Sequence, residues 1–566
     1  MSGMGKERLM WELEKFVVTR LRPFNEFTYL YNVPSAENRL QLMDAWWDWH
    51  EYRYRNSLGE LVGFPQLTNH EICHEMFWNA FRGRSKMYIQ IEDLRFDRDC
   101  KEGGDSFFRR LKDGGTVTLQ CSLLTLQMLD YDIMMFQAMS NSEDEEYKKA
   151  AQRFYRPYLF SYVAEINRDQ YDRLRELQKK AGEALPHERN ESFPYLWLVC
   201  TFNPDIDAPN IGFDGYVVQS ASSITKIRAQ LHIIEDAKTP VKTVKDILAA
   251  YKLSVSCLKD DPSFIQAIVK KLGNDRLLTI DAYKIGNGNC IYAQGNSGSM
   301  GFFYDIGFHY RHQPQKIAPG VTYSYVDTMK KIYAQHPSFF ILSHWDMDHI
   351  AGGIAARKDF LDKDWFAPDC CNACVDAQRF AKYLDMKSHL FLVEWPKTGS
   401  YSGRCIGKID IKSTTTPSQM IATYRFYMGG TASCDRSRSN CQGIVIEYTD
   451  QITQKKVLMM GDVNYASFNK ARATCGDLPF ADTPIDYLIA PHHGSKHTAY
   501  EKITDGKTPI IKGMLAIICC TNEPSGDRPN KCHKKELVTR FNDNVRTTED
   551  APPKDQCIRI RLCPPQ

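Results

Sequence analysis

The chain lacks the features that identify several large classes of protein. No apolar run approaches the roughly 20 residues that a membrane-spanning helix needs. The first eight residues contain no apolar core of the kind found in a signal peptide. The first half has no internal repeat, no low-complexity tract and no glycine loop for nucleotide binding. We therefore predict a cytoplasmic protein that does not enter a membrane.

The chain also lacks a strong excess of one charge. Its formal net charge is +3 over 566 residues, of which 25% are charged and 43% hydrophobic. Long nucleic acid usually binds to a broad basic surface, so any such surface here has to be local. The length and hydrophobic content are typical of a globular protein with more than one domain.

The 18 cysteines do not form a recognisable disulfide framework, because they are scattered and no export signal precedes them. We predict that most of them are reduced and buried. The cluster Cys370-Cys-Asn-Ala-Cys374 holds zinc only if other ligands join it, since no second pair occurs at the spacing of a zinc ribbon or finger.

Residues 1–274 are predicted to form a mostly helical domain of unknown role. Leu9, Leu13 and Phe16 recur at helical spacing. Further helices are predicted over 123–184, 222–234, 241–251 and 262–272, and short strands over 116–121 and 195–200. This half is a candidate for binding a substrate or a protein partner, or for holding the other half inactive.

One short motif in this half matches the His-Glu-x-x-His pattern of zinc proteases, in Thr68-Asn-His-Glu-Ile-Cys-His74. Thr68 and Glu71 also form a capping box, which gives Glu71 a structural role and puts His70 in the first helical turn. The protease motif lies inside a helix instead. We therefore do not predict a protease site.

From Leu277 onward, short apolar segments alternate with glycine turns and helical segments. Strands are predicted within 277–293, 301–307, 338–343 and 389–394. Strands that alternate with helices predict an α/β domain over residues 275–566.

The densest group of polar residues follows the predicted strand at 338–343. His344, Asp346, Asp348 and His349 occur within six positions. Carboxylates this close together are costly to bury unless a cation neutralises them. Imidazole with carboxylate suits zinc, manganese or iron. The alternative is a polar turn with two hydrogen-bonded histidines.

Two later predicted strands end in the same way. Val457-Leu-Met-Met-Gly-Asp462 ends on an aspartate, and Leu488-Ile-Ala-Pro-His-His-Gly-Ser495 ends on His492 and His493. One such ending is common. Three of them in one α/β region predict a metal centre.

These motifs, in this order, resemble the metallo-β-lactamase fold, and the most similar variant is the soluble C-terminal domain of the competence channel protein ComEC. Weaker likenesses are carried by Lys284-Ile-Gly-Asn-Gly-Asn-Cys290, Tyr304-Asp-Ile-Gly307, Asn530-Lys-Cys-His533 and Val545-Arg-Thr-Thr548. The resemblance covers about residues 277–566. Asp346 stands where the common motif has its second histidine, and the additional histidine of many hydrolases has no clear equivalent.

The resemblance implies an αββα sandwich with two divalent metal ions, zinc or manganese, at one edge. It implies that His344 and Asp346 hold one ion, that Asp348, His349 and His493 hold the other, and that Asp462 bridges them. The resemblance assigns no ion to His492, which is expected to hydrogen-bond a phosphate oxygen or to protonate a leaving group. His492 and Asp348 are the expected catalytic residues.

Three functions remain open at this point. The first is a metal-dependent phosphodiesterase or nuclease acting on DNA or RNA, with Arg436, Arg438 and His533 as substrate-binding residues. The two arginines suit backbone phosphate, although a solvated loop explains them equally well. The second is a hydrolase of a small phosphoester such as a cyclic nucleotide, which the near-neutral charge favours slightly. The third is an interaction protein with a structural metal site.

Overall fold

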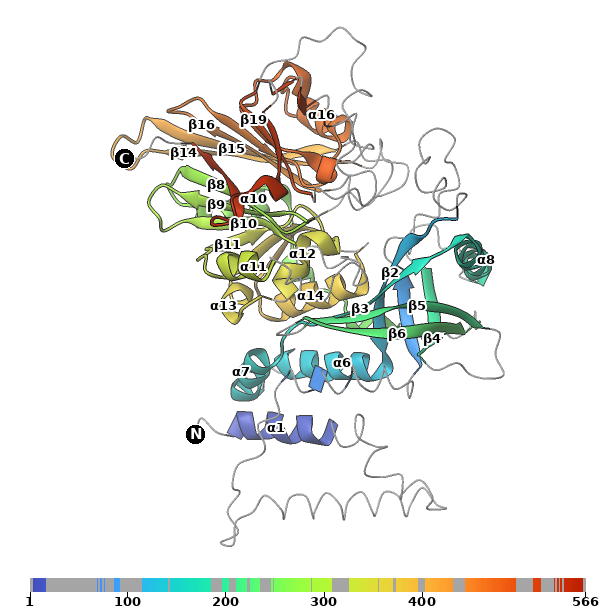
Figure 1. The fold of residues 1–566 in the computed structure, drawn as a ribbon. Helices are drawn as coiled ribbons and strands as arrows, with labels where there is room; N and C mark the ends of the chain where they lie inside the picture. Colours follow the sequence, from blue (N-terminus) through green and yellow to red (C-terminus); the bar gives the residue numbers. More distant parts are fainter. Residues whose placement is uncertain are drawn as a thin grey trace, which may run out of the picture.

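The computed structural model describes most of the chain. The described residues are 4–16, 69, 72–73, 76, 86–91, 114–140, 143–184, 196–202, 210–220, 224–234, 246–247, 249–286, 288–307, 325–354, 356–369, 373–394, 403–430, 443–494, 513–520, 534, 537–538, 540–541 and 544–562. Figure 1 shows an N-terminal region with a β-barrel and a C-terminal region with two sheets.

The N-terminal region contains a closed six-stranded barrel that the sequence did not predict. The barrel order is β1 (Met87–Ile91), β2 (Val117–Thr125), β3 (Leu159–Ile166), β5 (Asn210–Ser220), β6 (Ile224–Ile234) and β4 (Leu196–Thr201). The strands predicted near 116–121 and 195–200 are confirmed as β2 and β4. The description "mostly helical" therefore has to be corrected.

The helix predicted over 222–234 is wrong, because this segment forms strand β6. It pairs antiparallel with β5 along its whole length, and with β4 at its end. Isoleucine and threonine make up much of the segment, and their branched side chains favour a pleated surface over a helix. Leu231 fits the apolar spacing of a helix and of a strand, so periodicity alone did not decide between the two.

The helices of this region whose bounds lie among the described residues include α1 (Met4–Phe16), α6 (Leu126–Ser140), α7 (Glu145–Phe154) and α8 (Arg168–Ala184). Leu9, Leu13 and Phe16 are buried in α1, as predicted. None of the described helices combines the length and the apolar character that crossing a membrane requires. In the protease-like segment, Asn69, Ile72, Cys73 and Met76 are buried and helical, while Thr68, His70, Glu71 and His74 lie outside the described residues.

The C-terminal region contains two sheets, and the predicted α/β class is confirmed. The first sheet has the order β21 (Cys557–Arg561), β8 (Leu277–Tyr283), β9 (Cys290–Gly295), β10 (Gly301–Ile306), β11 (Phe339–Ile341), β12 (Asp364–Pro368), β13 (Leu390–Val393) and β7 (Leu258–Lys259). The second has the order β14 (Arg404–Lys412), β15 (Met420–Met428), β16 (Ile444–Asp450), β17 (Lys456–Met459), β18 (Tyr487–Ile489), β19 (Leu515–Ile518) and β20 (Val545–Thr547).

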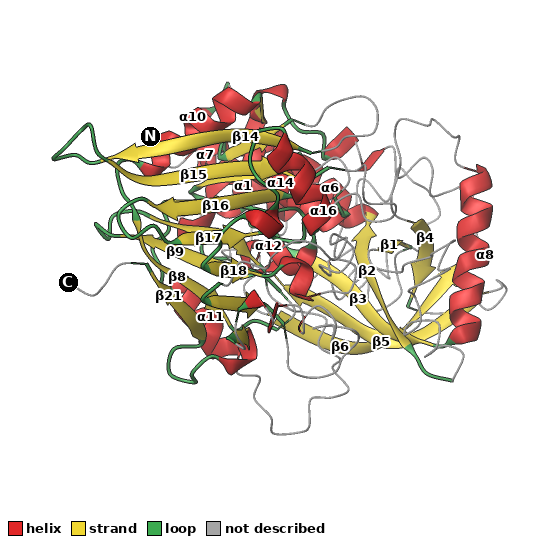
Figure 2. Ribbon diagram, turned by 90° about the horizontal axis from the view of Figure 1, so that it is seen from above, coloured by secondary structure: helices red, strands yellow, loops and turns green. Residues whose placement is uncertain are grey.

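The two sheets share one apolar core. Figure 2 shows them side by side, with the barrel strands to their right. Phe302 and Tyr304 of β10 face this core, whereas Phe303 between them faces the opposite side. The Tyr304 hydroxyl donates to the Ile444 carbonyl at 2.6 Å and so joins β10 to β16. Because both faces of the strands are buried, they appear in the sequence as continuous apolar runs.

Helices cover the outer faces of the sheets. Helices α12 (Met347–Ile354) and α14 (Val375–Met386) lie on the first sheet, and α16 (Tyr465–Ala473) lies on the second. Helix α10 (Asp261–Leu272) buries Phe264, Ile268 and Leu272 in the core between the sheets. Thus β7 and α10, which precede residue 274, join the C-terminal sheets. The division of the chain at that residue stays a prediction.

Most of the described cysteines are buried thiols. All nine free cysteines among the described residues are buried. One disulfide, Cys405–Cys475, joins β14 to the residues that follow α16. Cys374 is buried, and Cys370 and Cys371 lie outside the described residues, so zinc binding by that cluster stays untested.

Candidate metal centre

The candidate ligands lie where three strands end. Strand β11 leads to His344, β17 leads to Asp462, and β18 leads to His492 and His493. Strands β17 and β18 are parallel neighbours, so their carboxyl ends lie at the same edge of the second sheet. The His349 Nε2 and Asp462 Oδ1 atoms are 3.2 Å apart. His349, which follows a strand of the first sheet, therefore lies at this edge of the second sheet.

Helix α12 supplies Asp348 and His349 from its first turn, and all of its residues are buried. The helix approaches the end of β10 closely at Gly307. A Cβ atom on Gly307 would lie 1.6 Å from the Asp348 carbonyl oxygen, so only glycine fits there. The Asn289 amide donates to the same carbonyl at 3.0 Å and fixes the start of the helix.

The histidine pair has an unusual backbone. His492 and His493 both have left-handed φ angles, of 47° and 52°. Such angles cost roughly 1–3 kcal/mol at a residue other than glycine unless surrounding contacts hold them. Here the His492 amide donates to the Gly461 carbonyl at 2.9 Å, and His493 Nδ1 lies 2.7 Å from the Cys519 carbonyl oxygen. The turn directs two adjacent imidazoles towards Asp462.

The side chains converge in two overlapping groups, each with its ligand atoms within 4.8 Å of one another. His344, His349 and Asp462 form the first group; Asp348, His349 and His493 form the second. His493 Nε2 lies 3.2 Å from Asp348 Oδ2. Asp346 Oδ2 lies 3.4 Å from His344 Nε2, and Asp346 is the most exposed of these side chains, at 29%.

Hydrogen bonds from behind orient the imidazoles of His344 and His349. His349 Nδ1 lies 2.9 Å from Asp305 Oδ2, and His344 Nδ1 lies 3.0 Å from Ser343 Oγ. The Ser343 hydroxyl and amide both donate to Asp305, at 2.8 and 2.6 Å, and the Asn289 side chain donates at 2.8 Å. With their Nδ1 atoms engaged, His344 and His349 place Nε2 near Asp346 and Asp462, which is how metal-binding histidines are usually held.

These residues fit a bound cation. The Nε2 atoms of His344, His349 and His493 are buried, and no hydrogen bond satisfies them among the described residues. Burial alone raises the pKa of Asp462, but His492, His349 and His493 hold that pKa well below its usual value. Asp462 is therefore a carboxylate throughout the neutral range. Buried imidazole nitrogens facing a carboxylate are the donor set of zinc, manganese or iron.

The structure brings together seven of the predicted residues and leaves three undescribed. The seven are His344, Asp346, Asp348, His349, Asp462, His492 and His493. Arg436, Arg438 and His533 lie outside the described residues, so their role stays a prediction. The sequence motifs did not reveal the orienting role of Asp305, Ser343 and Asn289. The strand end Tyr304-Asp-Ile-Gly307 was the only signal for Asp305.

No protein-family model and no curated protein matches the chain. Solved structures give distant likenesses. The metallo-β-lactamase fold protein YhfI from Bacillus subtilis is 14% identical, covers 50% of this chain and 99% of its own, and has a TM-score of 0.28. The diiron β-hydroxylase CmlA from Streptomyces venezuelae is 11% identical, covers 51% and 55%, and has a TM-score of 0.26. Likenesses this distant assign neither a family nor an activity to this chain.

Proposed function

We propose that this protein is a metal-dependent hydrolase with the αββα arrangement of the metallo-β-lactamases, and that it cleaves phosphodiester bonds in nucleic acid. One observation carries the proposal. The Nε2 atoms of His344, His349 and His493 are buried, have no hydrogen bond among the described residues, and lie beside Asp348 and Asp462 where three strands end. The resemblance of the sequence motifs to the ComEC-type domain supports the choice of phosphodiester.

The metal ligands in this proposal are His344, Asp346, Asp348, His349, Asp462 and His493. A pair of divalent cations, zinc or manganese, supplies Lewis acidity and charge neutralisation at phosphorus when bound. Asp305 and Ser343 hold the imidazoles in place from behind.

His492 differs from its neighbour in this proposal, because it serves the substrate. Its Nε2 lies 3.6 Å from Asp462 Oδ2. From there it donates a hydrogen bond to a phosphate oxygen or a proton to the leaving group, while Asp348 completes the catalytic pair.

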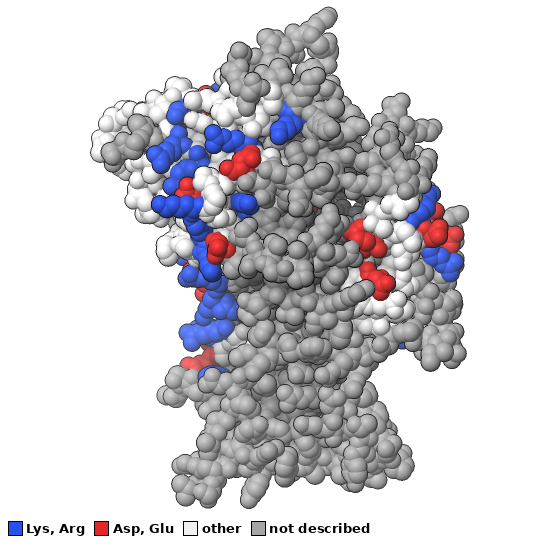
Figure 3. All heavy atoms as spheres, viewed as in Figure 1, with Lys and Arg blue, Asp and Glu red and all other residues white. Residues whose placement is uncertain are grey.

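A local basic surface supports nucleic acid as the substrate. Figure 3 shows lysine and arginine gathered on the side of the C-terminal region where β8, β9 and α11 (Tyr325–Tyr333) lie in Figure 1. Exposed basic residues of these and neighbouring elements include Lys330, Arg357, Lys358, Arg559 and Arg561. Lys330, Arg357 and Arg559 also form ion pairs, with Asp327, Asp359 and Asp281. In this proposal the surface contributes local positive charge towards backbone phosphates, although the net charge of the chain is only +3.

A small phosphoester, such as a cyclic nucleotide, is the second candidate substrate. The observation that favours it is the same net charge of +3, since acidic residues balance most of the basic ones. The active centre itself does not discriminate, because both substrates present a phosphodiester to the cations.

The deciding experiment measures cleavage by the purified protein loaded with manganese or zinc. DNA, RNA, cyclic nucleotides and a chromogenic phosphodiester are the substrates. We expect cleavage of a nucleic acid that stops when a chelator is added. Metal loading without cleavage of any phosphodiester would overturn the proposal.

Salt dependence then separates polymer from small molecule. Binding of nucleic acid to Asp348→Asn, once that variant is shown to hold metal, should weaken with salt by a log-log slope of about −0.7 to −0.9 per neutralised phosphate. Replacing Arg436 and Arg438 by alanine should reduce the slope by roughly one to two units. A flat salt series would instead favour the small phosphoester.

A further inference from the structure

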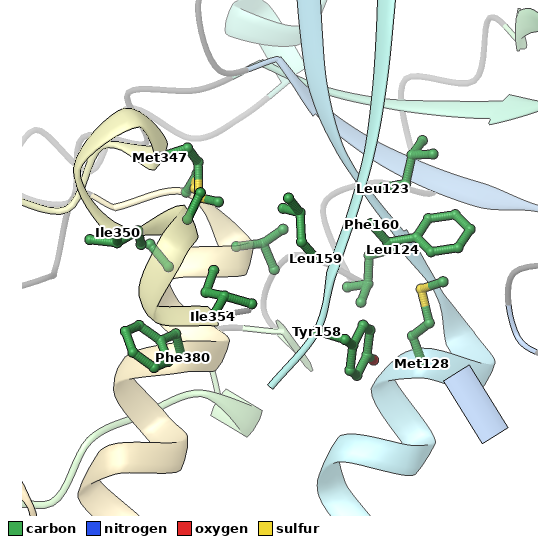
Figure 4. Close-up of a cluster of buried hydrophobic side chains, with 14 of the residues drawn as sticks. Leu123, Leu124, Met128, Tyr158, Leu159, Phe160, Met347, Ile350, Ile354 and Phe380 are labelled. Carbon is green, nitrogen blue, oxygen red and sulfur yellow. The ribbon is translucent and has the colours of Figure 1, made fainter. Parts of the chain in front are cut away.

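The N-terminal region has no assigned role, yet it is bonded to the helices that carry and support the metal centre. Figure 4 shows Leu159 and Phe160 of β3 and Leu123 and Leu124 of β2 on one side. On the other side are Met347, Ile350 and Ile354 of α12, with Phe380 of α14. All of these side chains are buried in one apolar cluster.

Helix α12 depends on this packing. It has only eight residues, and two of them are Gly352 and Gly353. A helix this short is not stable by itself, and each glycine weakens it by about 1 kcal/mol relative to alanine. The tertiary contacts of its apolar residues therefore hold the backbone that positions Asp348 and His349.

Helix α14 forms hydrogen bonds with the N-terminal region at both of its ends. At its start, the Val375 amide donates to Gln90 of β1 at 2.7 Å, and Ser122 of β2 donates to Asp376 at 2.9 Å. At its end, Gln152 of α7 donates to the Met386 carbonyl at 3.3 Å.

The middle of α14 is joined to α6 through a buried arginine. Arg379 is fully buried, and its Nε donates to Asp132 Oδ2 at 2.8 Å, while its Nη1 donates to Asp376. The hydroxyls of Tyr155, Tyr158 and Tyr251 also donate to Asp132. Removing one partner of a buried ion pair is much more disruptive than replacing the whole set, because it leaves a charge uncompensated.

The residue after this arginine contacts the metal-binding segments. The Phe380 ring lies 6.5 Å, centroid to centroid, from the ring of Trp345, which stands between His344 and Asp346 in the sequence. A Cβ atom on Gly353 of α12 would lie 3.2 Å from Phe380 Cζ. A shift of α14 is therefore passed to both segments that supply ligands.

We propose that docking of the N-terminal region onto α14 sets the affinity of the metal centre for its cations. Arg379 is the positioning residue of this interface between α14 and the N-terminal region, which we call the joint. The inference rests on the proposed metal centre. Because coupling between two sites is reciprocal, bound metal stabilises the docked N-terminal region to the same extent. A partner that pulls the barrel away from α14 lowers the metal affinity.

The test is a titration of the metal-free full chain with manganese, with the protein at the same temperature and pH throughout. Arg379→Met leaves Asp132 and Asp376 facing each other without a cation. We expect at least tenfold weaker binding of manganese by this variant. A triple variant, Arg379→Met with Asp132→Asn and Asp376→Asn, removes the uncompensated charges and should recover most of the wild-type affinity.

Arg472→Met is the matched control. Arg472 is also buried and ion-paired, to Glu447, and its described contacts lie within the C-terminal region. We expect it to lower thermal stability with less than a threefold change in manganese affinity. Equal affinity of wild type and Arg379→Met, or an equal loss in both arginine variants, would overturn the inference.

Hydrogen exchange supplies a second readout that does not depend on folding of the arginine variant. In wild type, manganese should slow amide hydrogen exchange in β3 and α6. If Arg379→Met fails to fold, Leu159→Ala takes its place in the titration and should weaken manganese binding. Unchanged exchange in both elements would contradict the coupling. A wild-type chain that binds no cation would instead overturn the proposed function itself.

Discussion

Two of the clusters in which the protein buries carboxylates differ in how the negative charge is compensated. Asp132 and Asp376, between the N-terminal region and α14, are paired with the internal cation Arg379. Asp348 and Asp462 face the imidazoles of His349 and His493. An arginine is charged at every accessible pH, whereas an imidazole is charged only when protonated.

The comparison explains why one cluster is a joint and the other a candidate reaction centre. Around Arg379, the carboxylates have a cation from within the chain, since Arg379 pairs with Asp132 and Asp376, and three tyrosine hydroxyls donate to Asp132. Arg379 Nη2 is the one atom of that guanidinium without a hydrogen-bond partner among the described residues. At the strand ends, three buried Nε2 atoms lack hydrogen bonds among the described residues. A buried cluster of the second kind is complete only with a cation from outside.

The first prediction removes the carboxylate that lies among the most imidazoles. Asp462→Ala should abolish hydrolysis and reduce the metal content, without unfolding the chain, because Asp462 lies within 4 Å of an Nε2 atom of His344, His349, His492 and His493. Metal analysis and circular dichroism of the same sample check it. Two ions retained in the folded variant would contradict the assignment of the bridge.

The second prediction separates the adjacent histidines. His493→Ala should lose an ion, because His493 Nε2 lies in a group with Asp348 and His349. His492→Ala should keep both ions and lose turnover, by roughly 10²–10⁴-fold if it acts in proton transfer. Metal analysis and turnover numbers of the two variants decide it. The opposite pair of results would exchange the two roles.

The third prediction concerns the effect of bound metal on the stability of the folded chain, and it does not depend on turnover. Metal at about 100 times its dissociation constant should stabilise the folded chain by about 2.7 kcal/mol, because only the folded state presents the assembled ligands. Thermal melts with added manganese or with a chelator measure this difference. Asp462→Ala is the control and should melt at the same temperature in both conditions.

The candidate centre was more predictable from the sequence than the joint, for a physical reason. Its ligands are close in the sequence within each segment, and each segment follows a buried strand, as His344 follows Phe339–Ile341. Asp132, Asp376 and Arg379 are ordinary charged residues on helical segments, and the sequence separation of 247 between Asp132 and Arg379 hides their contact. Asp305 was hidden in the same way, since its partner His349 is 44 residues away.

The barrel was missed because its strands depend on partners far along the chain. Strand β3 pairs with β2 and β5, and the segment before it is helical, so the predicted helical region over 123–184 ran through it. Helical periodicity is set within a few residues, whereas a strand is stabilised by neighbours that the local sequence does not reveal. The strands of the C-terminal sheets were easier to predict, because they are short apolar runs bounded by glycine turns.

The last prediction is the smallest and tests how much the tyrosine hydroxyls contribute to the arginine cluster. Tyr155→Phe removes the hydroxyl that donates to Asp132 Oδ1 at 2.7 Å, and hydrogen bonds to charged groups contribute about 1.5–3 kcal/mol. Tyr383→Phe is the matched control, because Tyr383 is also buried and its hydroxyl has no hydrogen-bond partner among the described residues. Chemical denaturation should show a free energy of unfolding lowered by about 1.5–3 kcal/mol in the first variant and nearly unchanged in the second. Equal losses would mean that the two substitutions act through ring packing, and that the hydroxyl at Asp132 contributes little to closing the joint.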